Sequence, residues 1–110
     1  MKITDIKTIR LQATIPTEGQ VFSRSGVRSS RSAMLIQVET DVGVRGLGSC
    51  SGNGELIEVI VAKVLKPLLL GMDPTQIEEV WDKAYVRGGH KEFGTRGIGV
   101  VALSGIDIAL

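Results

Sequence analysis

Apolar and polar residues alternate along the first part of the chain, a pattern typical of β-strands with one buried face. The alternation covers residues 2–14, returns over residues 33–40 and continues over residues 43–50 after a turn at Asp41-Val42-Gly43. Gly43 suits this turn because glycine adopts positive φ without steric cost. The pattern therefore predicts three consecutive strands that pair as an antiparallel meander.

The spacing of apolar residues changes to a helical period in the second half of the chain. We expect Pro67 to end the first helix, because proline lacks the N–H that an interior helical position donates. Asp73 and Gln76 are expected to cap the second helix. Strands followed by helices predict a single α+β domain in these 110 residues. The three helices are predicted near residues 55–66, 74–87 and 95–110.

Residues 15–32 separate the first two predicted strands and contain five serines and three arginines. Their polarity predicts a long loop, and long loops in compact domains are commonly functional. A guanidinium group can bind a carboxylate through two parallel hydrogen bonds, so the arginines are candidates for binding an anionic ligand. The residues by themselves favour the alternative, a basic loop that is solvated. The three arginines are Arg24, Arg28 and Arg31.

The glycine-rich segment 46–54 raises the question of a phosphate-binding loop. A dinucleotide fingerprint requires glycine at position 51, where this chain has Ser51, and no acidic residue follows at the required distance. The preceding strand is also predicted to pair in a hairpin, whereas the fingerprint belongs to a βαβ unit. These mismatches favour a bulged strand that runs into a tight loop.

Cysteine and histidine offer little for catalysis or metal binding. Cys50 is the only cysteine, which excludes an internal disulfide bond. One hypothesis makes Cys50 a nucleophile assisted by His90, and the alternative is that a single cysteine after a strand serves as a small packing residue. The scattered carboxylates have no metal-ligand spacing, so no metal site is predicted in this chain.

Composition narrows the class of protein. The chain is 43% hydrophobic and 23% charged, as in ordinary folded domains, and its net charge of +1 does not favour nucleic acid or a membrane surface as a partner. Charges interrupt the apolar residues of the first seven positions, which excludes a secretory signal there. The weakly polar stretch 98–110 is too short to span a bilayer. We therefore expect a cytoplasmic protein.

Several stretches, in order along the chain, resemble the N-terminal capping domain of enolase-superfamily enzymes of the mandelate racemase/muconate lactonizing type. Residues 38–48 resemble the hairpin T-D-x-G-x-x-G-x-G of that family, and residues 3–10 resemble its opening strand. Residues 67–81 resemble P-x-L-x-G-x-D-P followed by I-E and W, and residues 102–110 resemble A-x-S-x-I-D-x-A-L. The resemblance covers nearly the whole chain.

This resemblance implies a two-domain enzyme in which the α+β domain, a meander followed by three helices, caps a (β/α)₇β barrel that these 110 residues lack. In the family, barrel carboxylates hold Mg²⁺ and barrel bases abstract the proton α to a carboxylate. Catalytic and metal-binding residues are therefore expected outside positions 1–110, and this segment alone is expected to be inactive. We expect the chain to break off within its last helix, before the C-terminal barrel.

Two loops of the family's cap close over the barrel and contact the substrate, and they match residues 16–31 and 50–54 here. The resemblance thus predicts substrate-binding roles for Arg24, Arg28, Ser51 and Asn53. A polar, arginine-rich lid suits a sugar acid, so we expect an acid-sugar dehydratase or racemase. With the resemblance we also expect a homo-oligomer. The alternative function is a free-standing, non-catalytic module that binds a small molecule or another protein.

Overall fold

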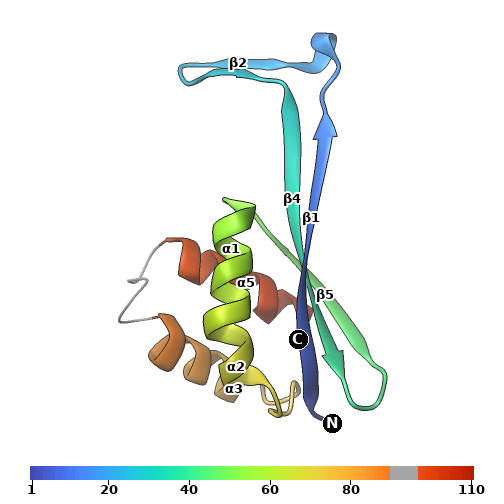
Figure 1. Ribbon diagram of the computed structural model, residues 1–110, viewed down its shortest axis with the longest axis vertical. Helices are drawn as coiled ribbons and strands as arrows, with labels where there is room; N and C mark the ends of the chain where they lie inside the picture. The colour runs from blue at the N-terminus through green and yellow to red at the C-terminus, as the bar shows by residue number, and fades with distance from the viewer. Residues whose placement is uncertain (90–96) are drawn as a thin grey trace.

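The computed structural model describes residues 1–89 and 97–110. Its main sheet has three antiparallel strands in the order β1-β4-β5, formed by Ile3–Thr14, Ser30–Thr40 and Arg45–Cys50 (Figure 1). The predicted α+β meander is confirmed. Strand β4 begins three residues earlier than predicted, because Thr14, Ala13 and Gln12 of β1 pair with Ser30, Arg31 and Ser32.

The segment predicted as one long loop is instead ordered as a projecting hairpin, so that prediction is wrong in its structure. A short 3₁₀ turn η1 (Thr17–Gly19) leads into β2 (Val21–Ser23), which pairs antiparallel with β3 (Gly26–Arg28). The backbone N–H of Ile15 donates to the carbonyl of Ser29 at 2.8 Å and closes the base of the hairpin. The sequence did not predict these strands, because each has only three residues and serines surround the few that favour β-structure. We call residues 15–29 the arm.

The first helical segment runs past the proline that was predicted to end it. Helix α1 (Gly54–Ile60) passes into a π-helical segment η2 (Val61–Leu65) and then into α2 (Lys66–Leu69). The widened turn lets a new helix begin at Lys66, and Pro67 then lies in its first turn, where the missing N–H removes no helical hydrogen bond. The prediction failed because it counted only one uninterrupted α-helix.

Helix α3 (Ile77–Lys83) begins later than the predicted residue 74 and continues into the π-helical segment η3 (Ala84–Gly89). The predicted caps do not form. Asp73 Oδ1 accepts from the backbone N–H of Thr75 at 2.9 Å and from its hydroxyl at 2.7 Å, which makes a local turn before the helix. These hydrogen bonds stabilise the carboxylate and lower the pKa of Asp73. Gln76 precedes the helix without a side-chain capping bond.

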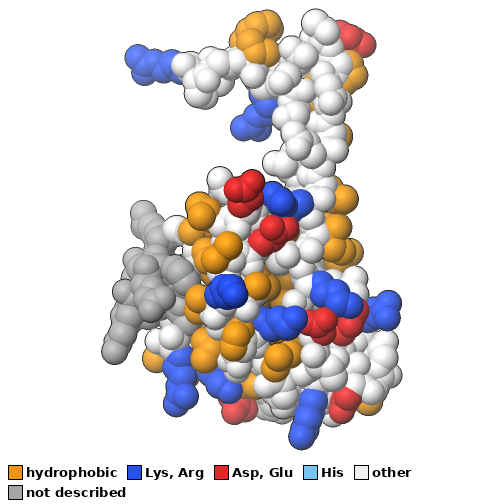
Figure 2. Space-filling model, viewed as in Figure 1, with side chains coloured by type: hydrophobic (Ala, Val, Ile, Leu, Met, Phe, Trp, Pro, Cys, Tyr) orange, Lys and Arg blue, Asp and Glu red, His pale blue; other side chains and the backbone are white. Residues whose placement is uncertain are grey.

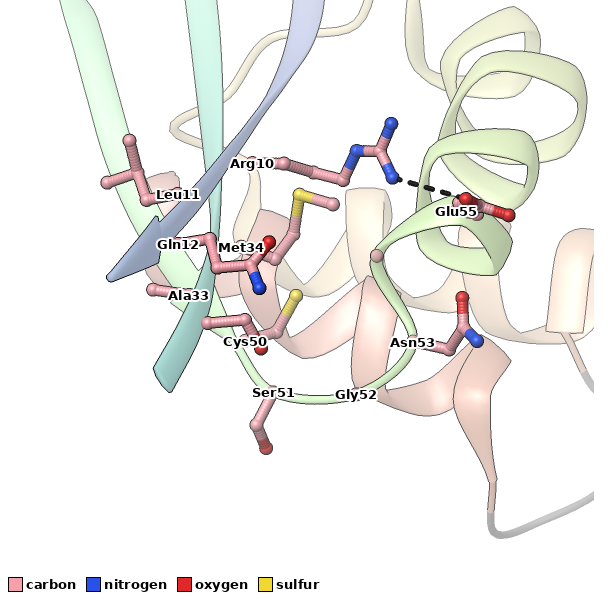
Figure 3. Close-up of a pocket in the computed structure, with 12 residues that line it drawn as sticks. Arg10, Leu11, Gln12, Ala33, Met34, Cys50, Ser51, Gly52, Asn53 and Glu55 are labelled. Atoms are coloured by element: carbon pink, nitrogen blue, oxygen red, sulfur yellow. Dashed lines mark ion pairs between the residues drawn. The ribbon is translucent and has the colours of Figure 1, made fainter. Parts of the chain in front are cut away.

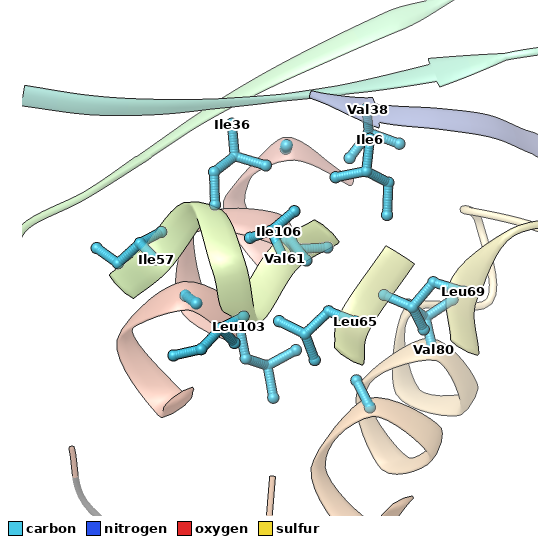
Figure 4. Close-up of a cluster of buried hydrophobic side chains, with 14 of the residues drawn as sticks. Ile6, Ile36, Val38, Ile57, Val61, Leu65, Leu69, Val80, Leu103 and Ile106 are labelled. Carbon is cyan, nitrogen blue, oxygen red and sulfur yellow. The ribbon is translucent and has the colours of Figure 1, made fainter. Parts of the chain in front are cut away.

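Helix α5 (Ile98–Ala109) crosses the same face of the sheet as the other helices, so the body has two layers (Figure 1). The start predicted at residue 95 lies outside the described residues. Side chains from the sheet and the helices meet in one core, and no polar or charged residue within the described ranges is fully buried (Figure 4). The largest fully buried side chains are Ile3, Ile36, Val38, Ile57, Val61, Leu65, Leu69, Val80 and Ile106.

The arm gives the molecule an elongated outline of 47 × 33 × 20 Å. It projects from the far ends of β1 and β4 toward the side on which the helices lie, and open space separates it from the body (Figures 1 and 2). Within the described residues, no helix is both long enough and apolar enough to cross a bilayer.

Candidate functional site

An open cleft of about 650 Å³ lies where β5 ends and the chain turns into α1 (Figure 3). Three strands and the connecting loop 51–53 contribute to its walls. We call it the loop cleft. Its lining is Arg10, Leu11, Gln12, Ser32, Ala33, Met34, Cys50, Ser51, Gly52, Asn53, Gly54 and Glu55.

The two predicted binding residues of the second loop, Ser51 and Asn53, both line this cleft. Ser51 is exposed at its rim, whereas Asn53 also has a structural task. The Asn53 Oδ1 atom accepts from the backbone N–H of Leu56 at 3.2 Å and caps α1. The amide nitrogen of Asn53 has both its N–H donors available for a ligand, because the capping bond uses only one lone pair of the oxygen.

Replacing Asn53 with alanine is expected to lower the free energy of unfolding by about 1 kcal/mol, the usual cost of a lost helix N-cap. Asn53→Ser is the matched control, since serine caps as well as asparagine does. Urea denaturation of both variants measures the difference. Equal stability of Asn53→Ala and Asn53→Ser would contradict the capping role.

Arg10 forms one wall of the loop cleft. No sequence motif had marked it as a candidate binding residue. Its Nε atom lies 2.9 Å from Glu58 Oε1 and its Nη1 atom 3.7 Å from Glu55 Oε1, both on α1 (Figure 3). A Cβ at Gly54 would lie 2.7 Å from Arg10 Cδ, so the arginine stem packs directly over that glycine. The apolar alternation of Ile9 and Leu11 pointed to the opposite face of β1 as the buried one, and the structure leaves that face exposed.

The polar groups of the loop cleft suit hydrogen bonding more than acid–base chemistry. Gln12 and Ser32 face each other across β1 and β4 and line the cleft together with Ser51 and Asn53. Hydroxyl and amide groups both donate and accept, as a polyhydroxylated ligand requires. The arrangement can therefore orient such a ligand.

The structure gives no support to Cys50 as a nucleophile. Burial raises the pKa of the Cys50 thiol, which lowers the fraction of reactive thiolate at neutral pH. Its proposed partner His90 lies outside the described residues. Across residues 1–89 and 97–110, no group of three or more His, Cys, Asp and Glu could hold a metal ion.

The two predicted arginines lie in the arm, apart from Ser51 and Asn53. Arg28 of β3 lines a second cavity of about 560 Å³ at the base of the arm, which we call the arm cavity. Arg24 lies in the turn at the hairpin tip and does not line it. The predicted binding residues thus fall into two places, which successive parts of β1 connect: residues 10–12 line the loop cleft, and Ala13 and Thr14 line the arm cavity.

Residues 5–110 match the family described as mandelate racemase / muconate lactonizing enzyme, N-terminal domain. The chain belongs to this family. The match includes both cavities and all the described helices and strands from Asp5 onward. It confirms the family that the sequence motifs predicted.

Curated relatives of this chain include enzymes named for acid sugars or their lactones. The chain is 36% identical over 111 residues to D-galactarolactone cycloisomerase from Agrobacterium fabrum, covering 100% of this chain and 28% of the relative. It is 35% identical over 112 residues to arabinonate dehydratase from Saccharolobus solfataricus, covering 98% of this chain and 30% of the relative. The chain thus spans less than a third of the length of these enzymes.

Solved structures have the same domain within larger chains. A racemase from Streptomyces coelicolor A3(2) with bound magnesium superposes with a TM-score of 0.82 at 28% identity, covering 97% of this chain and 30% of that one. The agreement extends the family assignment from sequence to three-dimensional structure. It also confirms that the α+β arrangement is the family's N-terminal domain.

Proposed function

We propose that this chain is the substrate-capping and specificity domain of an acid-sugar enzyme. The preferred activity is that of a dehydratase, and the second candidate is that of a racemase. The main observation in support is that successive residues of β1 line first the loop cleft and then the arm cavity, so the two cavities lie next to each other along this strand. A cap that meets its substrate there would contact it with polar groups from both. The acid-sugar dehydratase and cycloisomerase among the relatives support this substrate class.

In this proposal the rest of the protein is a C-terminal barrel that abstracts the proton α to the substrate carboxylate. Mg²⁺ in that barrel would supply electrostatic stabilisation of the enediolate, and the magnesium-bound racemase supports its presence. The described residues of this chain do not fit a metal ion. No step of the reaction is therefore assigned to a metal held by the cap.

The cap's own contribution is to bind, orient and enclose. Ser51 and the amide nitrogen of Asn53 would donate hydrogen bonds to substrate hydroxyl groups at the loop cleft. Arg24 and Arg28 would contact the distal part of the substrate from the arm. Closure of the arm would exclude water from the reacting carbon, where a solvated intermediate would be lost to side reactions.

The test is an assay of the full-length protein against a panel of acid sugars in D₂O. We expect a 2-keto-3-deoxy acid product, or exchange of the α-proton for deuterium, with at least one of them. Replacing arm residues 16–28 with a two-residue turn should lower kcat/KM at least tenfold, because the arm supplies binding energy and excludes water.

The matched control is Lys63→Ala, an exposed cation on the helical side of the body, and it should leave kcat/KM within twofold. Absence of both product and exchange with every acid sugar would refute the enzyme and leave a non-catalytic binding module. Full activity without the arm would refute the capping role.

A further inference from the structure

The arm carries a concentration of unneutralised positive charge. Glu18 is the only acidic residue between positions 15 and 38, against three arginines. Elsewhere in the described residues, Arg10, Arg45, Lys7 and Lys66 each pair with a carboxylate, whereas Lys2, Lys63, Lys83 and Arg87 form no ion pair but do not line the cavity that the arginines near the arm share. Within those same residues, no ion pair or hydrogen bond involves the side chains of the arm arginines or of the adjacent Arg31.

Two of the three arginines lie in one cavity. Arg28 and Arg31 both line the arm cavity, whereas Arg24 at the hairpin tip does not. Strand pairing explains why the two arginines share a cavity. Arg28 is paired with Val21 in the small sheet, and Arg31 is paired with Ala13 in the main sheet. The two sheets meet at the base of the arm. The remaining walls are largely apolar and include Ala13, Ile15, Pro16 and Val21.

Two guanidinium groups that line one cavity repel each other, and an anion bound between them relieves that repulsion. A carboxylate offers two oxygens with about four lone-pair sites and can accept from both guanidinium groups at once. The cavity therefore has the charge and the donor groups that a carboxylate site requires.

We propose that Arg28 and Arg31 bind a second carboxylate, at the distal end of the substrate, and so select dicarboxylic over monocarboxylic acid sugars. This inference rests on the proposed function, in which the first carboxylate, next to the abstracted proton, belongs to the barrel. An anion bound at the arm must then be a different group. In this proposal Arg31, and not Arg24, binds the second carboxylate together with Arg28.

The experiment compares a matched pair of substrates, a hexaric acid and the hexonic acid of the same configuration, with the full-length protein. Arg31→Ala and Arg28→Ala should each lower kcat/KM for the dicarboxylate about tenfold to a hundredfold, the effect of losing a charge-assisted hydrogen bond. Their kcat/KM for the monocarboxylate should fall several-fold less, because that substrate has no second carboxylate to lose, so the preference for the dicarboxylate should shrink. Lys63→Ala should change neither value.

Arg31→Lys separates a bidentate contact from a simple charge. Lysine keeps the charge but cannot reproduce the planar fork, so a bidentate site should lose most of the preference for the dicarboxylate. Full rescue by lysine would overturn the bidentate form of the proposal.

A carboxylate from the protein itself is the other source that these arginines could bind, and the two substrates separate the cases. If the arginines held the arm against another part of the protein, their loss would lower kcat/KM equally for both acids and lower Tm. That outcome would overturn the substrate site, as would unchanged selectivity.

Calorimetry of both acids keeps this inference distinct from the proposed reaction. Arginine-dependent binding of the dicarboxylate without turnover would refute the reaction and preserve the carboxylate site. Turnover of acid sugars with no dependence on Arg28 or Arg31 would preserve the reaction and refute the site.

Discussion

Alanine at position 48 is expected to lower the free energy of unfolding by more than about 3 kcal/mol, beyond the usual cost of adding one methyl to a packed core. A Cβ on Gly48 would lie 2.0 Å from the carbonyl oxygen of Gly105 and 2.9 Å from the backbone N of Ala109. Both atoms belong to the backbone of α5, which cannot rotate aside as a side chain would. Strand β5 and α5 would have to separate.

The matched control for this prediction is Ser49→Ala, at the next residue of the same strand. Ser49 is exposed, so its replacement should change stability by less than about 0.5 kcal/mol. Urea denaturation followed by circular dichroism measures both variants against the parent protein. A Gly48→Ala variant as stable as Ser49→Ala would show that β5 and α5 do not pack as closely as described.

The second large effect is expected for Ile36→Ala, at about 2–5 kcal/mol. Ile36 is fully buried in the middle of β4, and its side chain points into the core between the sheet and the helices (Figure 4). Its Cδ1 lies only 2.7 Å from the position that a Cβ on Gly105 would occupy, so little space surrounds it. Alanine would leave a cavity that this close-packed interface cannot fill by small shifts.

Leu47→Ala provides the control of similar chemistry on the opposite face of the sheet. Leu47 of β5 is 57% exposed, so its truncation removes little buried surface and should cost less than about 1 kcal/mol. The same denaturation experiment measures both variants. Similar losses for Ile36→Ala and Leu47→Ala would contradict the assignment of the buried face.

The sequence predicted the meander and the three helical regions because their periods are regular over many residues. Apolar alternation misplaced the buried face in the second half of β1, because Ile9 and Leu11 are 38% and 49% exposed while Arg10 lies on the helix side. The arm was missed for a different reason. Its two strands of three residues each are too short for a period to be recognised, and they form because their ends are joined by the pairing of Thr14 with Ser30.

Family motifs predicted that two loops of this chain would contribute to one region, and four residues were selected from them. The structure divides these residues, since Ser51 and Asn53 line the loop cleft while Arg24 and Arg28 lie in the arm. Asn53 also caps α1, a role that depends on the residue at which the helix begins. Arg31 was one of the three arginines considered for an anionic ligand, but only the strand pairings show that it shares a cavity with Arg28.

Local sequence by itself determined the order of the strands and helices and the family of this protein. These follow from apolar periodicity and from motifs that lie within short stretches of chain. Tertiary structure alone decided which side chains share a cavity, because residues distant in sequence meet only through strand register and helix packing. Gly48 illustrates the difference: its sequence context suggested a bulge or a close backbone approach, and the structure shows that the close approach occurs and that the backbone of α5 makes it.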